Sequence, residues 1–104
     1  MDLLPKEIRE TIPKYTPDLE EPATAVVKWF TPDANASWFV AAVDGDRAWG
    51  VADLGLGFPE YGSFSVREIQ TLTGPLGLPV ERDKSFEPTP LADILRTLEA
   101  GGDV

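Results

Sequence analysis

The chain has 104 residues, of which 42% are hydrophobic, and it contains neither cysteine nor histidine. This length suits one small domain, and the missing side chains exclude disulfide bonds, thiolate or imidazole nucleophile pairs, and metal sites built on sulfur or imidazole. The formal net charge of −9 argues against direct binding to nucleic acid, which requires a surface rich in lysine or arginine.

The sequence shows no sign of membrane insertion or export. No stretch approaches the roughly 18 apolar residues that cross a bilayer, and the amino terminus MDLLPKEIRE lacks the basic-then-apolar pattern of a signal peptide. We therefore expect a cytoplasmic protein that does not bind membranes. Residues 1–22, 23–64 and 65–104 carry six acids against three bases, five against two, and seven against four. An acidic patch would therefore have to be assembled by folding.

The amino-terminal residues 3–12, LLPKEIRETI, are predicted to form a short amphipathic helix. Pro5 is compatible with this prediction, because the first turn of a helix tolerates a residue without an amide hydrogen. Apolar residues at every fourth position form one stripe that should face the core. The stripe consists of Leu4, Ile8 and Ile12. Residues 13–22 are rich in proline and acids, so we expect an extended connection with Tyr15 and Leu19 against the sheet.

Residues 24–53 contain three apolar runs, TAVVKWF, ASWFVAAV and RAWGVAD. β-Branched and aromatic residues favour strands, and the breaks between these runs are rich in Pro, Asp, Asn and Gly, so we predict an antiparallel meander. The sequence Asp-Gly-Asp at 44–46 is typical of a tight hairpin turn. Both alternating sets of the middle run are apolar, so both faces of that strand should be covered. The two sets are Trp38, Val40 and Ala42, and Phe39, Ala41 and Val43.

Each of the three runs contributes one tryptophan, at positions 29, 38 and 49. We expect these side chains in the core, whereas a tryptophan exposed beside Tyr61 would be a hot spot for binding. The glycine-rich segment LGLGFPEYG at 54–62 is expected to form a packed turn, because it lacks the glycine patterns that cradle phosphates. Residues 61–65 then form a short fourth strand anchored by Tyr61 and Phe64.

The carboxyl-terminal third contains two further helix signals. Ser65 and Glu68 match a capping box, which predicts a helix over residues 66–73. Its inward face would consist of Val66, Ile69 and Leu72. Residues 74–83, GPLGLPVERD, are expected to form a compact loop that carries Leu76, Leu78 and Val80. Residues 91–100, LADILRTLEA, predict a last helix with an apolar face. That face consists of Leu91, Ile94, Leu95 and Leu98.

These elements predict one α+β domain, in which helices from both chain ends pack on a small antiparallel sheet of three or four strands. The domain divides into an amino-terminal helix and linker (1–22), a β-meander (23–65), and a region of helices with the GPLGLP-ERD loop (66–104).

Several segments of the chain resemble an uncharacterised family of small bacterial proteins known as domain of unknown function 2958. They are LLPKEIRETIPKY, VVKWFTPD, ASWFV, ADLGLGFPEYGSFSVREI and GPLGLPVERDKSFEPTPL, and they extend from Leu3 to Leu91. The last of these segments is the most specific. The resemblance implies a protein carried by plasmids, conjugative elements and phages, often beside antirestriction and DNA-processing functions. It supplies no catalytic residues.

The acidic balance and the implied mobile-element origin favour a non-enzymatic protein that binds a basic protein surface. The partner would be a nuclease or nucleoprotein complex of a host defence system, inhibited in the manner of an anti-CRISPR or antirestriction protein, because spaced carboxylates can imitate a nucleic-acid backbone. Turn chemistry is the competing explanation for these acids. The candidate contact residues around the sheet are Asp33, Asp44, Asp46, Asp53, Glu60 and Tyr61.

The charged triplet Glu81-Arg82-Asp83 has two interpretations. Arg82 would either pin its loop to a carboxylate elsewhere or contribute, with its two neighbours, to partner binding. We expect no cofactor. Two other functions stay open: an accessory role in plasmid DNA processing, and a magnesium-dependent phosphodiesterase, since magnesium needs only one or two carboxylates. The acids available for such an enzyme are Asp44, Asp46, Asp53, Glu81 and Asp83.

Overall fold

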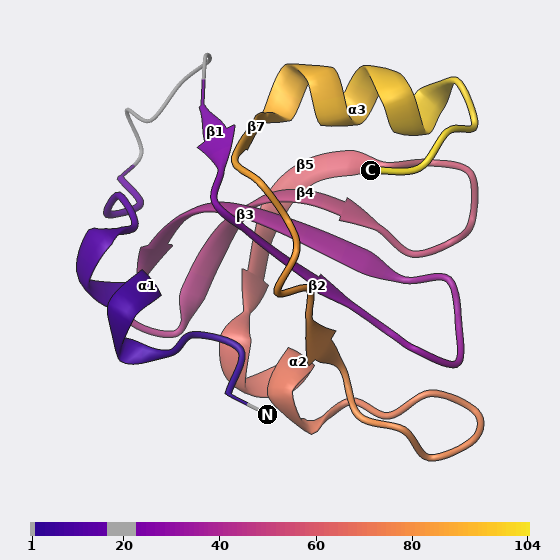
Figure 1. Ribbon diagram of the computed structural model, residues 1–104, viewed down its shortest axis with the longest axis horizontal. Coiled ribbons are helices and arrows are strands. Elements are labelled where there is room, and N and C mark those ends of the chain that lie inside the picture. The colour runs from indigo at the N-terminus through magenta and orange to yellow at the C-terminus, as the bar shows by residue number, and fades with distance from the viewer. Residues whose placement is uncertain (1, 17–22) are drawn as a thin grey trace.

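The computed structural model describes residues 2–16 and 23–104, so the expected position of Leu19 lies outside the described residues. Within these ranges the chain forms an α+β domain, as predicted (Figure 1). Its elements are α1 (Lys6–Thr11), β1 (Thr24–Ala25), β2 (Val27–Phe30), β3 (Ser37–Asp44), β4 (Arg47–Asp53), β5 (Glu60–Ser65), α2 (Val66–Thr71), β6 (Glu81–Arg82), β7 (Thr89–Pro90) and α3 (Leu91–Glu99).

The main sheet is antiparallel and has the strand order β5-β4-β3-β2-β6. The predicted meander is confirmed, but the described residues form five strands here rather than three or four, plus a small sheet of β1 and β7. The first apolar run is divided between the two sheets. Val26 separates its halves, and Thr24 and Ala25 pair with Pro90 and Thr89 instead of continuing along β3.

β3 is the central strand, and apolar side chains cover both of its faces, as predicted. Trp38 and Val40 belong to the core on one face of the sheet, and Phe39 and Ala41 to the core on the other. The expected position of Val43 is wrong, because its side chain packs with Trp38 and Val40. A β-bulge between Val40 and Ala42 shifts the pairing with β4 and reverses the alternation beyond it.

Gly50 lies opposite this bulge on β4, in register with Val40. A Cβ atom at Gly50 would lie 1.8 Å from the main-chain oxygen of Phe39 and 2.9 Å from its carbonyl carbon. No side chain can move to relieve such a contact, because both atoms belong to the backbone. The close approach of the two strands at the bulge therefore requires glycine.

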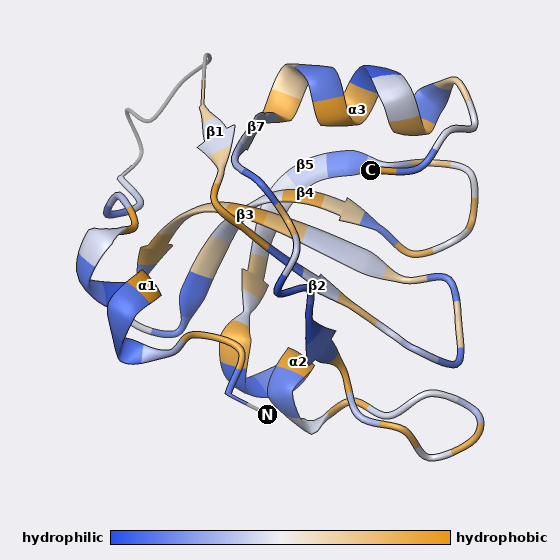
Figure 2. Ribbon diagram, in the orientation of Figure 1, coloured by the Kyte–Doolittle hydropathy of each residue, from blue (hydrophilic) through white to orange (hydrophobic). Residues whose placement is uncertain are grey.

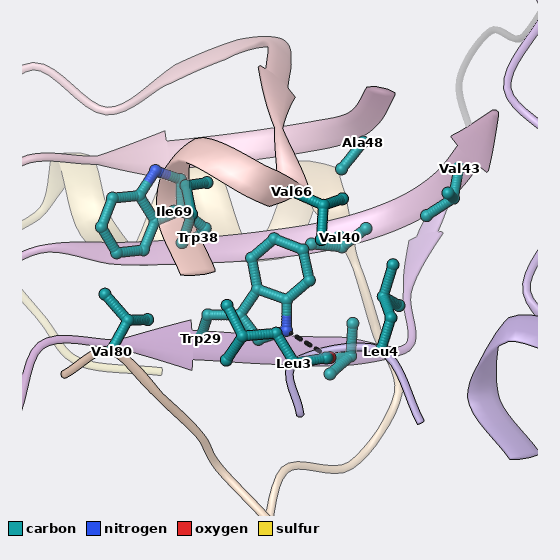
Figure 3. Close-up of a cluster of buried hydrophobic side chains, with 11 residues drawn as sticks. Leu3, Leu4, Trp29, Trp38, Val40, Val43, Ala48, Val66, Ile69 and Val80 are labelled. Carbon is teal, nitrogen blue, oxygen red and sulfur yellow. Dashed lines mark hydrogen bonds between the residues drawn. The ribbon is translucent and has the colours of Figure 1, made fainter. Parts of the chain in front are cut away.

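The first core lies between the sheet and the amino-terminal segment with α2 (Figure 3). Trp29 is fully buried, and its indole Nε1 donates a hydrogen bond of 2.8 Å to the main-chain oxygen of Leu3. This bond satisfies the polar atom of the buried indole. The predicted first helix is shorter than expected, since Leu3 and Leu4 are buried ahead of it while Ile8 packs against the core from α1.

The predicted capping serine of α2 is confirmed. The Ser65 hydroxyl oxygen accepts a hydrogen bond from the amide of Glu68 at 3.1 Å. The helix ends at Thr71, earlier than expected, and Leu72 beyond it is exposed rather than facing the core. Val66 and Ile69 face inward as predicted.

The second core lies under α3, on the opposite face of the sheet. Leu91 and Ile94 are fully buried there, and Leu95 and Leu98 are partly buried against them, which confirms the predicted apolar face. In Figure 2 the hydrophobic stripe of α3 is turned toward the sheet. None of the helices within residues 2–16 and 23–104 is long and apolar enough to cross a bilayer.

Candidate protein-binding surface

The loop between β4 and β5 exposes three large apolar side chains. The exposed fractions of Leu54, Leu56 and Phe58 are 57%, 73% and 77%. The expectation that this segment forms a packed turn is therefore wrong. With Ala52 and Glu60, these side chains line an open groove of about 290 Å³. We call residues 54–58 the apolar loop.

Local backbone chemistry fixes the shape of the apolar loop. Gly55 and Gly57 adopt positive φ angles of 78° and 84°, in the region that favours glycine. The Asp53 carboxylate accepts a hydrogen bond of 2.9 Å from the amide of Gly55, in the manner of an Asx turn. Glycine thus alternates with the apolar residues, and the chain bends without placing them beneath a covering layer.

Strand β5 leads away from the apolar loop and carries an aromatic stack. The ring of Tyr61 stacks on Trp49 with centroids 5.9 Å apart, and the ring of Tyr15 also stacks on Trp49, with centroids 6.2 Å apart. Trp49 is half-buried and Tyr61 is exposed, whereas Trp29 and Trp38 are buried. The core prediction is therefore confirmed for two tryptophans, and the third lies beside Tyr61. Aromatic side chains at such positions are frequent hot spots of protein interfaces.

A second hollow, of about 560 Å³, lies at the opposite end of β5. Its lining includes three acids, Asp44, Asp46 and Glu68, and one base, Arg47, beside Ser63 and Ser65 of the strand. Hydrogen bonds from the Ser65 hydroxyl and from the amide of Arg67 lower the pKa of Asp46. The carboxylate of Asp46 is therefore ionised at neutral pH and well below it.

The structure divides the five predicted rim acids between the two ends of the sheet. Asp44 and Asp46 lie at the β3–β4 turn, while Asp53 and Glu60 lie at the far end of β4 and β5. The length of β4 separates these pairs by roughly 20 Å, given about 3.3 Å per residue. Asp33 lies between β2 and β3, at the end near Asp53. The acids therefore do not form one continuous patch along the sheet.

Asp33 has a structural role that its own turn does not reveal. Its Oδ2 accepts a hydrogen bond of 2.8 Å from the amide of Leu76 and one of 3.4 Å from that of Leu78. A Cβ atom at Gly74 would lie 1.6 Å from the other carboxylate oxygen of Asp33. The carboxylate thus holds the 74–78 loop at close range. Of the three apolar residues in the predicted 74–83 loop, Val80 is buried, whereas Leu76 and Leu78 are exposed.

The charged triplet contributes a strand that the sequence did not predict. Glu81 and Arg82 form β6 and pair with Phe30 and Trp29 of β2. The amide of Asp83 donates a hydrogen bond of 2.9 Å to the carbonyl oxygen of Lys28. Main-chain pairing therefore positions the triplet on the edge of the sheet opposite β5.

The acids proposed for a magnesium site do not converge. The described residues contain no cluster of three acids that could hold a metal ion. Asp44 and Asp46 are a strand length away from Asp53, and Glu81 with Asp83 lies across the sheet.

Sequence reasoning missed the apolar loop as a candidate site. The hydrophobic character of LGLGF was visible, but hydrophobic residues indicate a core as readily as a surface. The one signal of exposure in the sequence was the alternation of glycine with large apolar residues. In the structure two of these glycines adopt positive φ angles, which regular helices and strands do not contain, so the apolar residues between them are not part of a packed element.

A protein-family model described as "Protein of unknown function (DUF2958)" matches residues 3–104. No curated protein and no solved structure matches the chain significantly.

Proposed function

The chain belongs to the DUF2958 family of proteins of unknown function, and from the geometry of its surface we propose that it acts by binding a basic protein, without catalysis. The exposure of Leu54, Leu56 and Phe58 on one loop carries this proposal. Contiguous exposed apolar side chains rimmed by polar residues mark interaction sites in soluble proteins. Here the rim is acidic, since Asp53 and Glu60 flank the loop.

The proposed partner is a nucleic-acid-handling protein of a host defence system. Proteins that bind nucleic acid present lysine and arginine side chains to the phosphates, and such a surface would attract a chain with a net charge of −9. The resemblance to proteins carried by mobile elements agrees with this choice of partner. By covering the basic surface, the bound protein would inhibit the defence system.

The acidic charges and the apolar loop would contribute differently to binding. Charges spread over the molecule accelerate encounter and are screened by salt. The large side chains of the apolar loop would supply most of the binding free energy once they are desolvated, because a few apolar anchors usually dominate an interface. We therefore expect salt to slow association while substitutions in the apolar loop accelerate dissociation.

The test is an affinity capture from bacterial extract at low and high salt, with three versions of the full chain as bait. They are the unchanged chain, the double variant Leu56→Ser with Phe58→Ser, and the control Leu76→Ser. Leu76 is a matched control, because it is 80% exposed on a different loop. We expect the unchanged chain and the control to retain a basic nucleic-acid-handling protein at low salt, and the double variant to lose it. Retention of the same proteins by all three baits would contradict the proposal.

A further inference from the structure

We propose that β5 is the site at which the partner adds an extended segment as a sixth, antiparallel strand, with basic residues in its amino-terminal half and apolar residues in its carboxyl-terminal half. This inference rests on the proposed function and specifies its binding mode. Addition of a strand to a sheet edge is an established way of recognising extended peptides, in which main-chain hydrogen bonds supply affinity and alternate side chains supply specificity.

The outer edge of β5 is the first argument. In the described part of the chain β5 is an edge strand, hydrogen-bonded to β4 and to no other strand. The amide of Val66 bonds to the Asp46 carbonyl at 2.8 Å. Main-chain groups alternate in direction along a strand, so those of Phe64 also face β4, and those of Ser63 point away from the sheet. Ser63 is exposed, which leaves its main chain accessible to an added strand.

The contrast with the other edge is the second argument. Edge strands are commonly protected by shortness, by lysine or by proline, because an open edge pairs readily with other chains. The β6 edge has two residues, whereas β5 has six and contains neither lysine nor proline. The long edge thus lacks these protective features, and it lies beside the apolar loop.

The environment of β5 sets the chemistry of the added strand. The groove of the apolar loop lies at the Glu60 end, and the acidic hollow with Asp44, Asp46 and Glu68 lies at the Ser65 end. An antiparallel strand begins beside Ser65 and ends beside Glu60. Its first residues would therefore meet a hollow lined by three acids and one arginine, Arg47, whose net charge is negative. Its last residues would meet Leu54, Leu56 and Phe58.

A second copy of the chain fits this edge poorly. Antiparallel pairing of two β5 strands would place the apolar groove of each copy beside the acidic hollow of the other. Two molecules that each carry a net charge of −9 also repel one another. Charge complementarity thus favours a basic segment over self-association.

The test uses synthetic peptides and the full chain. The probe has eight residues, acetylated and amidated: three arginines, then two threonines, then three valines. The first control has the same residues in reverse order, and the second has N-methyl groups on alternate main-chain nitrogens of the probe. We expect the probe to bind about tenfold more tightly than the reversed peptide, which corresponds to about 1.4 kcal/mol. The N-methylated peptide should not bind, and the probe should slow hydrogen exchange at the amide of Ser63.

Equal affinity for the probe and the reversed peptide would overturn the inference, as would absence of binding at about 1 mM or protection confined to residues far from β5. A dimer held together through β5, detected by sedimentation, would overturn it as well. The variant Ser63→Pro adds a second readout, because proline removes the amide that faces outward. The N-methylated peptide on the unchanged chain gives the same information if this variant does not fold.

The proposed function and the strand addition can fail separately. If extract capture yields no basic partner, the proposed function fails. If a partner is captured but the folded Ser63→Pro variant retains it as well as the unchanged chain does, the proposed function stands and strand addition at β5 is wrong.

Discussion

The central strand β3 and the apolar loop have similarly hydrophobic sequences and opposite environments. Residues 38–43 of β3 are all buried, with a core on each face, whereas the large side chains of residues 54–58 are exposed. Hydrophobicity alone therefore does not decide burial in this molecule. A side chain is buried where a helix or a connecting segment lies over the sheet, and α3, α2 and the amino-terminal segment supply those layers for β3.

This difference separates stability from binding. Substitutions around β3 should lower the free energy of unfolding, because they leave cavities or force backbone contacts. Substitutions in the apolar loop should leave that free energy nearly unchanged and weaken partner binding. The predictions below test this separation, beginning with the substitution of largest expected effect.

The substitution Gly50→Ala should destabilise the protein most. Its Cβ would lie 1.8 Å from the main-chain oxygen of Phe39, so β3 and β4 would have to separate at the bulge. Overpacking that must be relieved by backbone shifts costs typically 1–3 kcal/mol, and we expect a loss of about 3 kcal/mol in urea unfolding. Gly62→Ala is the matched control, because Gly62 pairs with Gly50 from β5 and has no atom within 4 Å of an added Cβ. Equal losses for the two variants would contradict the role assigned to the bulge.

The substitution Asp33→Ala should have an intermediate effect. It removes the acceptor for the amides of Leu76 and Leu78, and a hydrogen bond contributes about 1 kcal/mol to stability. We expect a loss of about 1 kcal/mol in unfolding and faster hydrogen exchange at the amide of Leu76. Asp44→Ala removes an exposed acid at the other end of the sheet and should leave both quantities unchanged. An unaltered exchange rate at Leu76 in the Asp33 variant would show that other contacts hold the loop.

The elements that were predicted correctly from the sequence are those that depend on interactions between residues close together in the chain. The Asp-Gly-Asp turn appears as a hairpin in which Gly45 has a φ of 59°, and Ser65 caps α2. The helix over residues 91–99 and the two-sided burial of β3 also follow from periodicity. Such features depend on neighbours within a few residues, which a single sequence contains.

The features that sequence reasoning missed depend on contacts between distant segments. β6 has two residues, and it is a strand because these residues pair with Trp29 and Phe30 on the edge of β2. Asp33 was considered as turn chemistry or a partner contact, but its Oδ2 accepts hydrogen bonds from residues 43 and 45 positions further along the chain. The bulge that turns Val43 toward the first core has no pattern of its own in an all-apolar run. The exposure of the apolar loop likewise arises because no other segment of the described chain covers it, and the alternation of glycine with large apolar residues was its one local signal.

The pH dependence of stability should reveal a smaller contribution from Asp46. Hydrogen bonds from Ser65 and Arg67 lower its pKa from the ordinary value of 3.8, so these bonds favour the ionised form in the folded state. The resulting stabilisation is fully present above the unfolded pKa and is lost as the pH falls through the lower pKa of the folded state. The stability difference between the unchanged chain and Asp46→Asn should therefore be constant from neutral pH to about 5 and shrink below about 4. Asp44→Asn serves as the control, and a difference that grows on acidification would contradict the assignment.

The double variant Leu56→Ser with Phe58→Ser should have the smallest effect on stability. Both side chains are more than 70% exposed, at 73% and 77%, so their removal returns little apolar area to water on unfolding. We expect a change within about 0.5 kcal/mol in urea unfolding, the range of ordinary surface substitutions. The same variant should lose the captured partner. A loss of several kcal/mol would instead mean that the apolar loop packs onto the domain in solution, and the contrast with β3 would then disappear.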